Sequence, residues 1–400
     1  MPSNQELIRR AGSAIDKAAL GGERLLSPDQ GRAFVDEVLK IGETLQHVRT
    51  ETLTTPTKKI NKMGIKARGL RAGAENTAPT KQKPFTFGQV VMTPVKLDLA
   101  YELTDEAMDD NIEQEQFRTH AANLTTSQIG TDLNDIMWNG DVTDYSAAAT
   151  QLNGALAAGA LTMTVDSAAD FPSASSGFGF LLIGSERISY TAKTGTTFTG
   201  LTRAEDEDDS DAATGDVNHA DNAAVTFVPD ALFKAYDGVI KLVNSGGNVI
   251  DPSAIGDGGM SLDLFNAMLD AIPSRFIQRG AFGDSWRWHA NRKTIRAWVR
   301  AVSARMTASG DRSIEGEKLK PFGYAWQEDE HIADGTVVFG PQKAIIQAVR
   351  TNNIRFRSTN QGVDAVSRDI TYYKWSTFAQ VKLDEPTAFA IAESISIAIA

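Results

Sequence analysis

The chain of 400 residues carries a net charge of −11 and contains no cysteine, and these properties exclude several classes of protein. Without cysteine there are no disulfides, thiolate metal ligands or cysteine nucleophiles, and a reducing cytoplasm is the expected place of synthesis. The overall acidity argues against a dedicated nucleic-acid binder. The length predicts two or three domains, and an apolar content of 42% predicts that the chain is globular. No apolar run approaches the roughly 18 residues of a membrane span, and the N-terminus lacks the layout of a signal peptide.

The first 48 residues are expected to form a helical arm. Apolar residues recur at helical spacing from Leu7 to Ala19, and a Gly21-Gly22 break follows. Ser27-Pro28 then begins a second helical stripe that includes Leu45. These stripes are too short for a core of their own, so we expect the arm to pack on the body or on a neighbouring subunit.

An extended and basic segment comes next. Residues 49–84 are polar and rich in Gly, Thr and Pro, without periodicity, as in functional or disordered loops. From Phe85 to Tyr101 the apolar residues alternate with the period of a strand. They are Val91, Thr93, Val95, Leu97, Leu99 and Tyr101. Pro94 interrupts the hydrogen-bond ladder, which favours an edge strand.

One long amphipathic helix is predicted after this strand. Thr104 is the expected N-cap, two acids follow in the first turn, and Gly140 lies just past the end. Apolar residues at mostly three- and four-residue spacing continue the helix for about nine turns. We expect Leu124 and Leu133 to face the protein body.

Residues 151–228 form a different unit, predicted to be all-β. Short strands separated by turn signals are expected at 161–165, 178–183, 187–191, 197–201 and 223–228. Three bases against eleven acids give this segment a charge of −8.

The remaining chain is mixed. Helices are predicted at 231–242, at 262–272 with Ser261 as N-cap, and from Asn291 onward. Strands are predicted at 285–289, 335–340, 344–349, 354–357 and 370–383.

The order of these elements resembles the major capsid protein of tailed bacteriophages, the Hong Kong 97-type fold. In that family an extended loop returns as a strand into a spine helix that ends in a small-residue turn like Trp138-Asn139-Gly140. Glycine-led and apolar strands follow late in the chain, and a long strand ends in proline and an alanine–phenylalanine pair, as in Pro386-Thr387-Ala388-Phe389. The sequence from Asp170-Phe171-Pro172, through Ile183-Gly184-Ser185-Glu186, to His219-Ala220 also resembles small β modules of phage tail and other virion proteins.

This resemblance implies an α+β fold with an inserted all-β barrel or sandwich. The expected divisions are an N-terminal arm (1–48), an extended β-hairpin loop (49–101), a spine helix with peripheral domain (102–150), the inserted β domain (151–228), an axial domain (229–320) and return strands (321–400). The implied function is structural: self-assembly into hexamers and pentamers of an icosahedral shell around double-stranded DNA, in a virion assembled in the host cytoplasm. A portal and a separate scaffolding protein are expected partners, because the arm is short for a built-in scaffold, and no membrane is involved.

Interfaces, and not a reactive site, are expected to perform this function. The basic loop should lie over the acidic spine helix of an adjacent subunit. The candidate residues are Lys58, Lys59, Lys62, Lys66, Arg68 and Arg71 on the loop, with Asp105, Glu106, Asp109 and Glu113 on the helix. Some family members link a loop lysine covalently to a neighbour's asparagine, and these lysines lie in the corresponding region. The β domain, which packaged DNA would repel, is expected to project outward; a lateral filler between capsomers is the alternative.

No catalytic, cofactor or metal constellation is predicted. The five histidines lack metal-ligand spacing. The acidic run 205–211 fails as a calcium loop because Asp211 replaces the required glycine and Val217 the bidentate glutamate. Two alternatives stay open: another virion component from the tail, neck or decoration, and an enzyme with an appended β module, since paired carboxylates are set by space and not by sequence.

Overall fold

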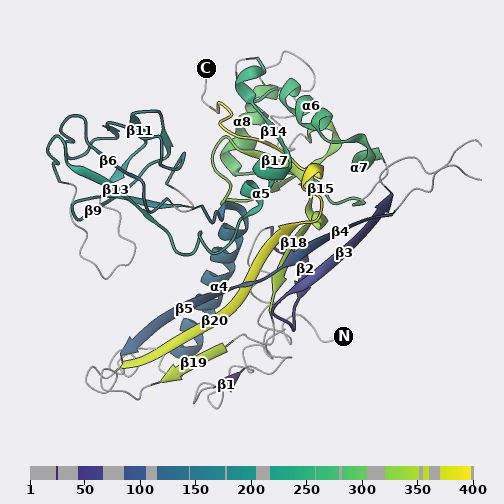
Figure 1. The fold of residues 1–400 in the computed structure, drawn as a ribbon, viewed down its shortest axis with the longest axis horizontal. Helices are drawn as coiled ribbons and strands as arrows, with labels where there is room; N and C mark the ends of the chain where they lie inside the picture. The colour runs from purple at the N-terminus through teal and green to yellow at the C-terminus, as the bar shows by residue number, and fades with distance from the viewer. Residues whose placement is uncertain are drawn as a thin grey trace, which may run out of the picture.

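The structure, a computed structural model, describes residues 24–25, 44–65, 85–104, 115–143, 145–175, 178–203, 217–256, 258–278, 282–303, 320–350, 355–359 and 370–397. Figure 1 shows a long narrow sheet with helix α4 beside it, a part with several helices above, and an all-β module to the left. Among the described residues, no helix is long and apolar enough to cross a membrane.

The long sheet is organised around β20 (Ile370–Leu383), a strand of 14 residues. One edge of β20 pairs antiparallel with β5 (Val95–Thr104). The other edge pairs with β18 (Ile345–Val349) and then with β19 (Arg355–Thr359), which lie one after the other along it. Two short strands complete the sheet, β2 (Arg49–Thr52) beside β18 and β1 (Arg24–Leu25) beside β19. The strands predicted at 344–349, 354–357 and 370–383 are therefore found, with bounds of Ile345–Val349, Arg355–Thr359 and Ile370–Leu383 in the described residues.

The break predicted at Pro94 is confirmed, because β4 (Phe85–Met92) ends before it and β5 begins after it. From Leu97 to Tyr101 the odd-numbered side chains are half-buried and pack on the main core, as the alternation predicted, and Leu103 continues the pattern. The prediction that Val91, Thr93 and Val95 share this face is wrong, since all three are exposed and Met92 is buried. The proline interrupts the strand. Before it the even-numbered side chains Val90 and Met92 face inward, and after it the odd-numbered side chains do so from Leu97 onward.

Helix α4 (Glu115–Asn139) is the long helix expected after β5. Thr104 is the last residue of β5, and its predicted capping role concerns residues 105–114, which lie outside the described residues. Leu133 is buried as predicted, but Leu124 is 60% exposed, so the prediction that it faces the body is wrong. The buried stripe runs through Thr126, Ile129 and Leu133, and Leu124 lies two positions away from it, about 200° around the helix.

Gly140 ends α4 as predicted, but the reason is a close approach between two backbones. A Cβ atom on Gly140 would lie 2.3 Å from the carbonyl oxygen of Tyr236, and one on Gly238 would lie 2.7 Å from the backbone nitrogen of Gly140. The amide of Gly238 donates to the carbonyl of Gly140 at 2.7 Å. Helix α5 (Val239–Gly246) begins at this contact, so the helix predicted at 231–242 starts too early. Residues 231–236 form turns instead.

The part above the long sheet is built on a mixed five-stranded sheet. Its strands, in spatial order, are β14 (Asn248–Ile250), β21 (Ala390–Ala392), β17 (Val337–Pro341), β15 (Trp286–Ala290) and β16 (Ala325–Glu328). Its other helices are α6 (Leu262–Ala271), α7 (Ser274–Gln278) and α8 (Arg292–Ser303), with short 3₁₀ turns at Pro252–Ala254, Pro321–Gly323, Gln342–Ala344 and Pro386–Ala388. Ser261 caps α6 as predicted, its hydroxyl accepting from the amide of Leu264 at 3.2 Å. The aromatic side chains of Phe265 and Trp288 meet at the centre, with ring centroids 4.7 Å apart.

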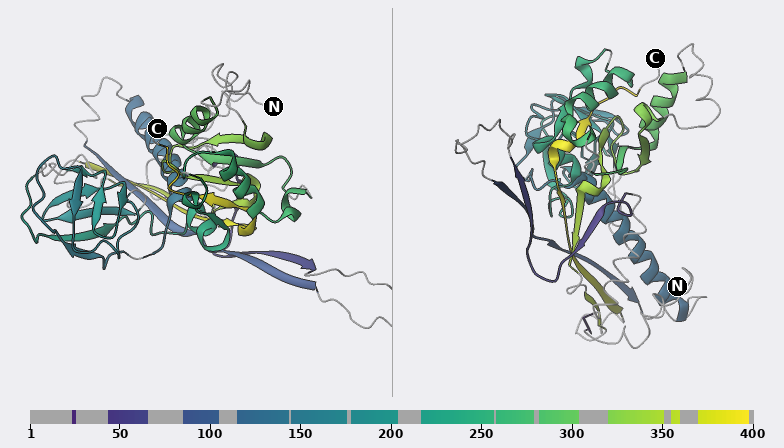
Figure 2. Two further views of the ribbon diagram at one scale, coloured as in Figure 1. Left: turned by 90° about the horizontal axis from the view of Figure 1, so that it is seen from above. Right: turned by 90° about the vertical axis from the view of Figure 1, so that its right-hand side faces the viewer.

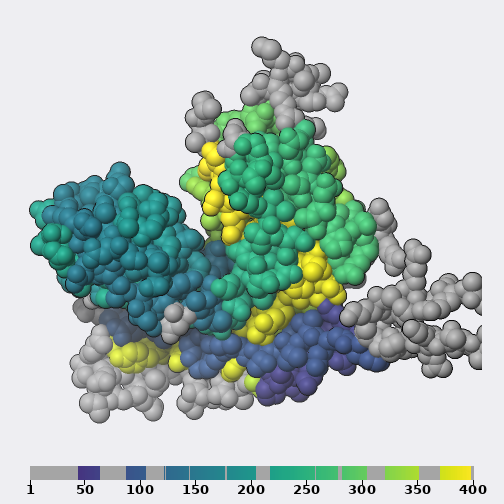
Figure 3. All heavy atoms as spheres, turned by 45° about the horizontal axis from the view of Figure 1, so that its top comes forward, coloured from purple at the N-terminus to yellow at the C-terminus, as the bar shows by residue number. Residues whose placement is uncertain are grey.

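The all-β module contains two sheets around one apolar core. The larger sheet has the order β12 (Thr202–Arg203), β9 (Glu186–Ser189), β8 (Gly179–Ile183), β13 (Ala224–Pro229) and β6 (Ala149–Gln151). The smaller has the order β10 (Ala192–Lys193), β11 (Thr197–Thr199) and β7 (Thr162–Thr164). Each of the five predicted strands is present, and Gly184 supplies the positive φ of 65° that the β8–β9 turn requires. Figure 3 shows the module as a lobe joined to the rest of the molecule along one side.

The predicted helical arm is described only at its end and at Arg24–Leu25; residues 1–23 and 26–43 lie outside the described residues. Leu45 lies in a turn and not in a helix. The amide of His47 donates a hydrogen bond to the carbonyl of Thr44 at 2.9 Å and closes this turn. Its side chain is 1% exposed and belongs to the main core, so this end of the arm packs on the body, as expected.

Candidate functional site

The hairpin of β3 (Lys58–Ile65) and β4 is a two-stranded antiparallel ribbon that extends beyond the body, as the left view of Figure 2 shows. Residues 66–84, between its strands, lie outside the described residues. Because side chains alternate along each strand, the ribbon has two faces. The inner face carries Ile60, Val90 and Met92 against a small apolar cluster. That cluster consists of Leu53, Ile346 and Ala348.

Two of the predicted interface lysines anchor the hairpin to its own subunit. Lys58 Nζ lies 2.5 Å from the carboxylate of Glu51, and Lys62 Nζ lies 2.9 Å from Asp384 and 3.2 Å from Glu385. The hydrogen bond from Lys58 holds the pKa of Glu51 below its usual value. Both pairs lie on the inner face, so they fix the angle at which the ribbon leaves the body.

The outer face of the hairpin carries apolar side chains without a partner in the described part of this chain. Met63 lies directly opposite Phe87 across the two strands, and these side chains are 67% and 77% exposed. Val91 lies on the same face, paired across the ribbon with Lys59. Sequence reasoning missed this face because it weighed only the lysines. The signal was present in the period-two pattern Phe85-Thr86-Phe87, which pairs with Met63-Gly64-Ile65.

Of the remaining predicted interface residues, the structure describes Lys59 alone. Lys59 is exposed and forms no ion pair with a described residue. The other members of the predicted set lie outside the described residues: Lys66, Arg68, Arg71, Asp105, Glu106, Asp109 and Glu113. The predicted contact between loop and helix of adjacent subunits therefore stays a prediction.

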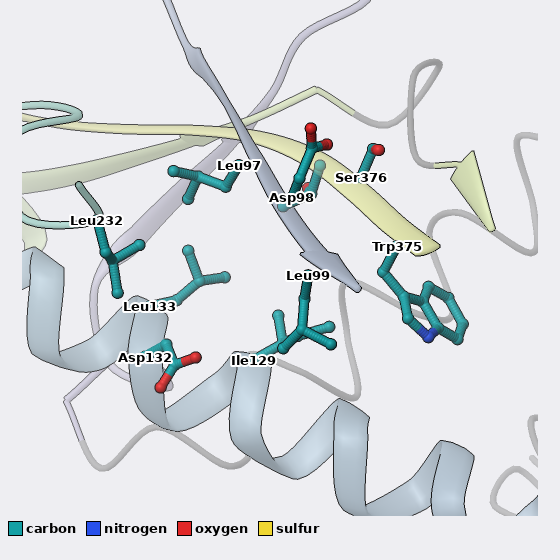
Figure 4. Close-up of a pocket in the computed structure, with 10 residues that line it drawn as sticks. Leu97, Asp98, Leu99, Ile129, Asp132, Leu133, Leu232, Trp375 and Ser376 are labelled. Atoms are coloured by element: carbon teal, nitrogen blue, oxygen red, sulfur yellow. The ribbon is translucent and has the colours of Figure 1, made fainter. Parts of the chain in front are cut away.

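An apolar pocket opens between α4 and the long sheet, with a cavity volume of about 170 Å³. Leu97 and Leu99 of β5 point into it from one side, and Ile129 and Leu133 of α4 from the other (Figure 4). Leu232 closes one end.

Asp132 is the acid of the α4 wall of this pocket. It accepts a 2.7 Å hydrogen bond from Gln128 and has no ion pair within the described part of the chain. Burial raises the pKa of its carboxyl. The other acid at the pocket, Asp98, is already paired with Lys96 and Lys374 on the sheet.

A buried carboxylate, Asp329, ties α4 to the rest of the core. Asn134 Nδ2 and Trp138 Nε1 of α4 donate to it at 3.0 and 2.8 Å, and the Thr44 hydroxyl and the His331 ring also lie within hydrogen-bond distance. Burial opposes ionisation, but these hydrogen bonds outweigh it, and the pKa of Asp329 lies below its usual value. The partners are up to 285 residues apart in sequence, so no local pattern could have predicted this site.

His289 on β15 lies beside this network without joining it. Neither ring nitrogen has a hydrogen-bond partner among the described residues, and the side chain is fully buried. Its ring lies 5.2 Å from that of Trp138. Burial lowers the pKa of His289 to about 4. It is therefore a neutral core residue, in agreement with the prediction that the histidines are structural or exposed.

The module has its own buried polar network, formed by motif residues that carried its resemblance to virion modules. Arg203 makes a two-pronged contact with Glu186 at 2.6 and 2.8 Å, and His219 Nε2 lies 2.6 Å from the same carboxylate. Arg203 also donates to the carbonyls of Ala157 and Val217. These residues link four segments of the module, so their role is architectural. The acidic run 205–211 lies outside the described residues.

Within the described ranges, no group of three or more histidine and acidic side chains is placed to hold a metal ion. Two buried carboxylates found there, Asp329 and Glu186, connect elements of the fold. Two surfaces of this described part lack partners in the chain, the outer face of the hairpin and the α4–β5 pocket.

Comparison with known proteins identifies the fold. No family model matches the chain. Over 153 residues it is 28% identical to YqbE of Bacillus subtilis (strain 168), named as a prophage capsid protein; the match covers 38% of this chain and 49% of that protein. This chain thus spans about half the length of the curated relative it matches.

Solved structures match over most of the chain. A chain of the satellite phage P4 procapsid including size determination (Sid) protein covers 99% of this chain and 98% of its own length, with a TM-score of 0.52 and 12% identity. A chain of the capsid of the native GTA particle covers 89% of this chain and 91% of its own, with a TM-score of 0.50 and 11% identity. The chain therefore has the α+β fold found in phage capsids, and the predicted fold class is confirmed.

Proposed function

We propose that this protein is a phage major capsid protein that self-assembles into the hexamers and pentamers of an icosahedral shell enclosing double-stranded DNA. The observation that carries the proposal is the fold shared with a chain of the P4 procapsid over nearly the whole of both chains. The partial sequence match to a prophage capsid protein supports it independently.

The geometry suits a subunit that acts through its neighbours. The hairpin projects from the body, its inner face is fixed by ion pairs, and its outer face exposes Met63 and Phe87. A large apolar side chain held in water on a well-anchored ribbon is expected where another molecule covers it. No catalytic role is proposed for this chain, since the buried acids and histidines described above serve as hydrogen-bonding nodes or core residues.

Three kinds of partner follow from this proposal. Copies of the chain form the capsomers, a portal occupies one vertex, and a separate scaffolding protein directs assembly in the host cytoplasm. Packaged DNA is contacted without sequence specificity. In this scheme residues 1–48 are the arm, 49–101 the extended loop, 102–150 the spine helix with the peripheral domain, 229–320 the axial domain and 321–400 the return strands.

The inserted module, residues 151–228, is proposed to project from the outer surface. Its charge of −8 would be repelled by DNA if it lined the inner wall. In the intact shell, a protease or antibody directed at residues 205–211 should reach that segment without disassembly. Access only after the shell is opened would place the module inside or between capsomers.

Electron microscopy of the purified recombinant protein tests the main proposal. Closed shells or capsomers are expected, with the scaffolding protein added if the chain alone stays monomeric. Rings or tubes would favour the alternative of a tail, neck or decoration protein, to which the β module also points. A monomer with hydrolase activity would overturn the structural role.

A further inference from the structure

Helix α8 presents an outer face made only of cations. Its exposed residues are Arg292, Lys293, Arg296 and Arg300, and the helix contains no acid. At about 100° per residue these four positions lie within an arc of roughly 100°, so their side chains leave the helix on one side. A basic stripe along one helix is typical of a surface that binds a polyanion. It contrasts with the net charge of −11 of the whole chain.

The opposite face of α8 is fixed in the core, so the cations are held on a rigid element. Trp298 is 3% exposed, and its ring packs on that of Phe265 from α6 with centroids 4.8 Å apart. At the start of the helix the side-chain oxygen of Asn291 accepts from the amide of Thr294 at 2.9 Å. In the right view of Figure 2, α8 (green) and the hairpin (purple) lie toward opposite sides of the molecule, so the basic face is separate from the hairpin.

Two of these cations stand where they are unfavourable for the helix itself. Arg292 and Lys293 occupy the first turn, at the positive end of the helix dipole, where acids are favoured. Their ion pairs offset this only in part. Lys293 lies 2.9 Å from Asp334, Arg292 lies 3.7 Å from Glu328, and both cationic side chains are 73% exposed. A departure from local helix preferences at an exposed site is expected where a functional requirement acts.

The composition of this face favours a nucleic acid over a protein as its partner. Arg296 and Arg300 form no ion pair with a described residue. The exposed positions of α8 include no apolar side chain, whereas the centre of a protein–protein interface is apolar and depleted in charged residues. Phosphate groups require only charge and hydrogen-bond donors, and the arginine guanidinium supplies both.

We propose that the outer face of α8 contacts the phosphate backbone of packaged DNA, and that this helix lines the inner wall of the shell. The inference rests on the proposed function and names the surface that meets the DNA. Arg292, Arg296 and Arg300 follow one another at roughly 6 Å along the helix axis. Two successive nucleotides advance about 7 Å along one strand of B-DNA, so the three guanidinium groups can follow a single strand. Because no base is read, the contact accepts any sequence.

The salt dependence of DNA binding tests the contact on soluble subunits, with a short labelled duplex and fluorescence anisotropy. Each phosphate contact contributes about −0.9 to the slope of log affinity against log salt concentration, so four contacts give about −3.6. The double variant Arg296→Gln/Arg300→Gln should halve this slope to about −1.8.

Two controls accompany this variant. Arg296→Lys/Arg300→Lys retains both charges and should keep the slope of the parent. Lys343→Gln removes an exposed cation outside α8 and should keep it too. Circular dichroism should be native for all three variants, since the substituted side chains are exposed.

Photo-cross-linking identifies the partner in the particle. Because the chain has no cysteine of its own, a thiol-reactive aryl azide can be attached at one chosen position. In DNA-filled particles that carry Arg296→Cys, irradiation should give an adduct that nuclease digestion reduces to nearly the mass of the chain. Leu161→Cys, at a side chain 69% exposed on the module, is the control position and should give no DNA adduct.

The failure of this inference and that of the proposed function are distinguishable. Either of two results would overturn the inference while the capsid function stands. One is wild-type protein that does not bind the duplex, or an Arg296→Gln/Arg300→Gln variant that keeps the parental slope. The other is a photoproduct at position 296 that joins two protein chains and resists nuclease, which would assign the face to a second copy or to the scaffolding protein. Wild-type protein that forms neither capsomers nor shells overturns the proposed function itself.

Discussion

The buried imidazole of His289 should make the stability of the subunit depend on pH, and replacing it should remove that dependence. Burial lowers its pKa from the usual value of 6.5 to about 4 in the folded chain. Between these values the unfolded chain binds a proton that the folded chain does not. Stability is therefore complete above pH 6.5 and declines as pH falls toward about 4. His331 works in the other direction: although burial lowers its pKa, its bond to Asp329 raises it above the usual value, so its contribution is lost as pH rises.

The size of the effect follows from the difference between the two pKa values of His289. The fall from 6.5 to about 4 corresponds to about 3 kcal/mol of unfolding free energy across this window. His289→Leu or His289→Phe should lose that slope and be equal to or more stable than the parent at pH 7, because neither ring nitrogen has a described partner to forfeit. Other titrating groups are common to parent and variants, so the difference between them isolates His289.

Urea denaturation, followed by tryptophan fluorescence, measures the free energy of unfolding of each protein. It is carried out at about pH 7.0, 5.5 and 4.5 to cover the window. Leu161→Ala is the control, since Leu161 is 69% exposed on the module and carries no titratable group, and it should keep the slope of the parent. Parallel pH curves for the parent and both His289 variants would refute the reasoning and show that the ring is partnered or hydrated in solution.

Two further predictions concern α4 and its buried anchor. Asp329→Asn should lower the free energy of unfolding by about 2–4 kcal/mol in thermal denaturation, because charge-assisted hydrogen bonds from Asn134 and Trp138 weaken. The control is Asp334→Asn at an exposed side chain, which should lower the free energy of unfolding by less than about 1 kcal/mol. Leu133→Asp should give insoluble protein, since it buries an unpaired charge, whereas Leu124→Asp should remain folded and soluble, as gel filtration would show.

The fold was predictable wherever local pattern and tertiary burial agree. The alternation from Leu97 to Tyr101 and the capping serine Ser261 were predicted correctly, because one face of each element is buried and its ends carry ordinary signals. Leu124 was misplaced because the buried side of α4 is partly polar, with Thr126 and Asn134 facing inward. An apolar stripe therefore does not mark the packed face of this helix.

The candidate site was predictable only in outline. The sequence located the basic hairpin but not the division of its side chains between two faces, which depends on the register of β3 against β4. Lys58 and Lys62 find acids 7 and 323 residues away, and only the folded chain brings the second pair together. Phe87 drew no attention because an exposed aromatic residue and a buried one look alike in a sequence.

The last prediction concerns the boundaries of the module. Its core includes residues before position 151, so the module begins earlier than the segment 151–228 expected from sequence. Ala148 is 4% exposed in the module core, Tyr145 packs against it, and β6 begins at Ala149 and pairs with β13. Replacing 151–228 by a short Gly/Ser linker would leave these side chains without their core. Replacing 145–229 removes the whole core and cuts in turn-like segments on both sides.

We therefore expect the 145–229 replacement to give soluble protein with a native main core. The 151–228 replacement should be less soluble and bind a hydrophobic dye, because it exposes the stranded apolar residues. The melting temperature of the body in the longer replacement should stay near that of the parent. Equal behaviour of the two replacements would show that residues 145–150 belong to the body, and loss of folding in both would show that the module is an integral part of the subunit core.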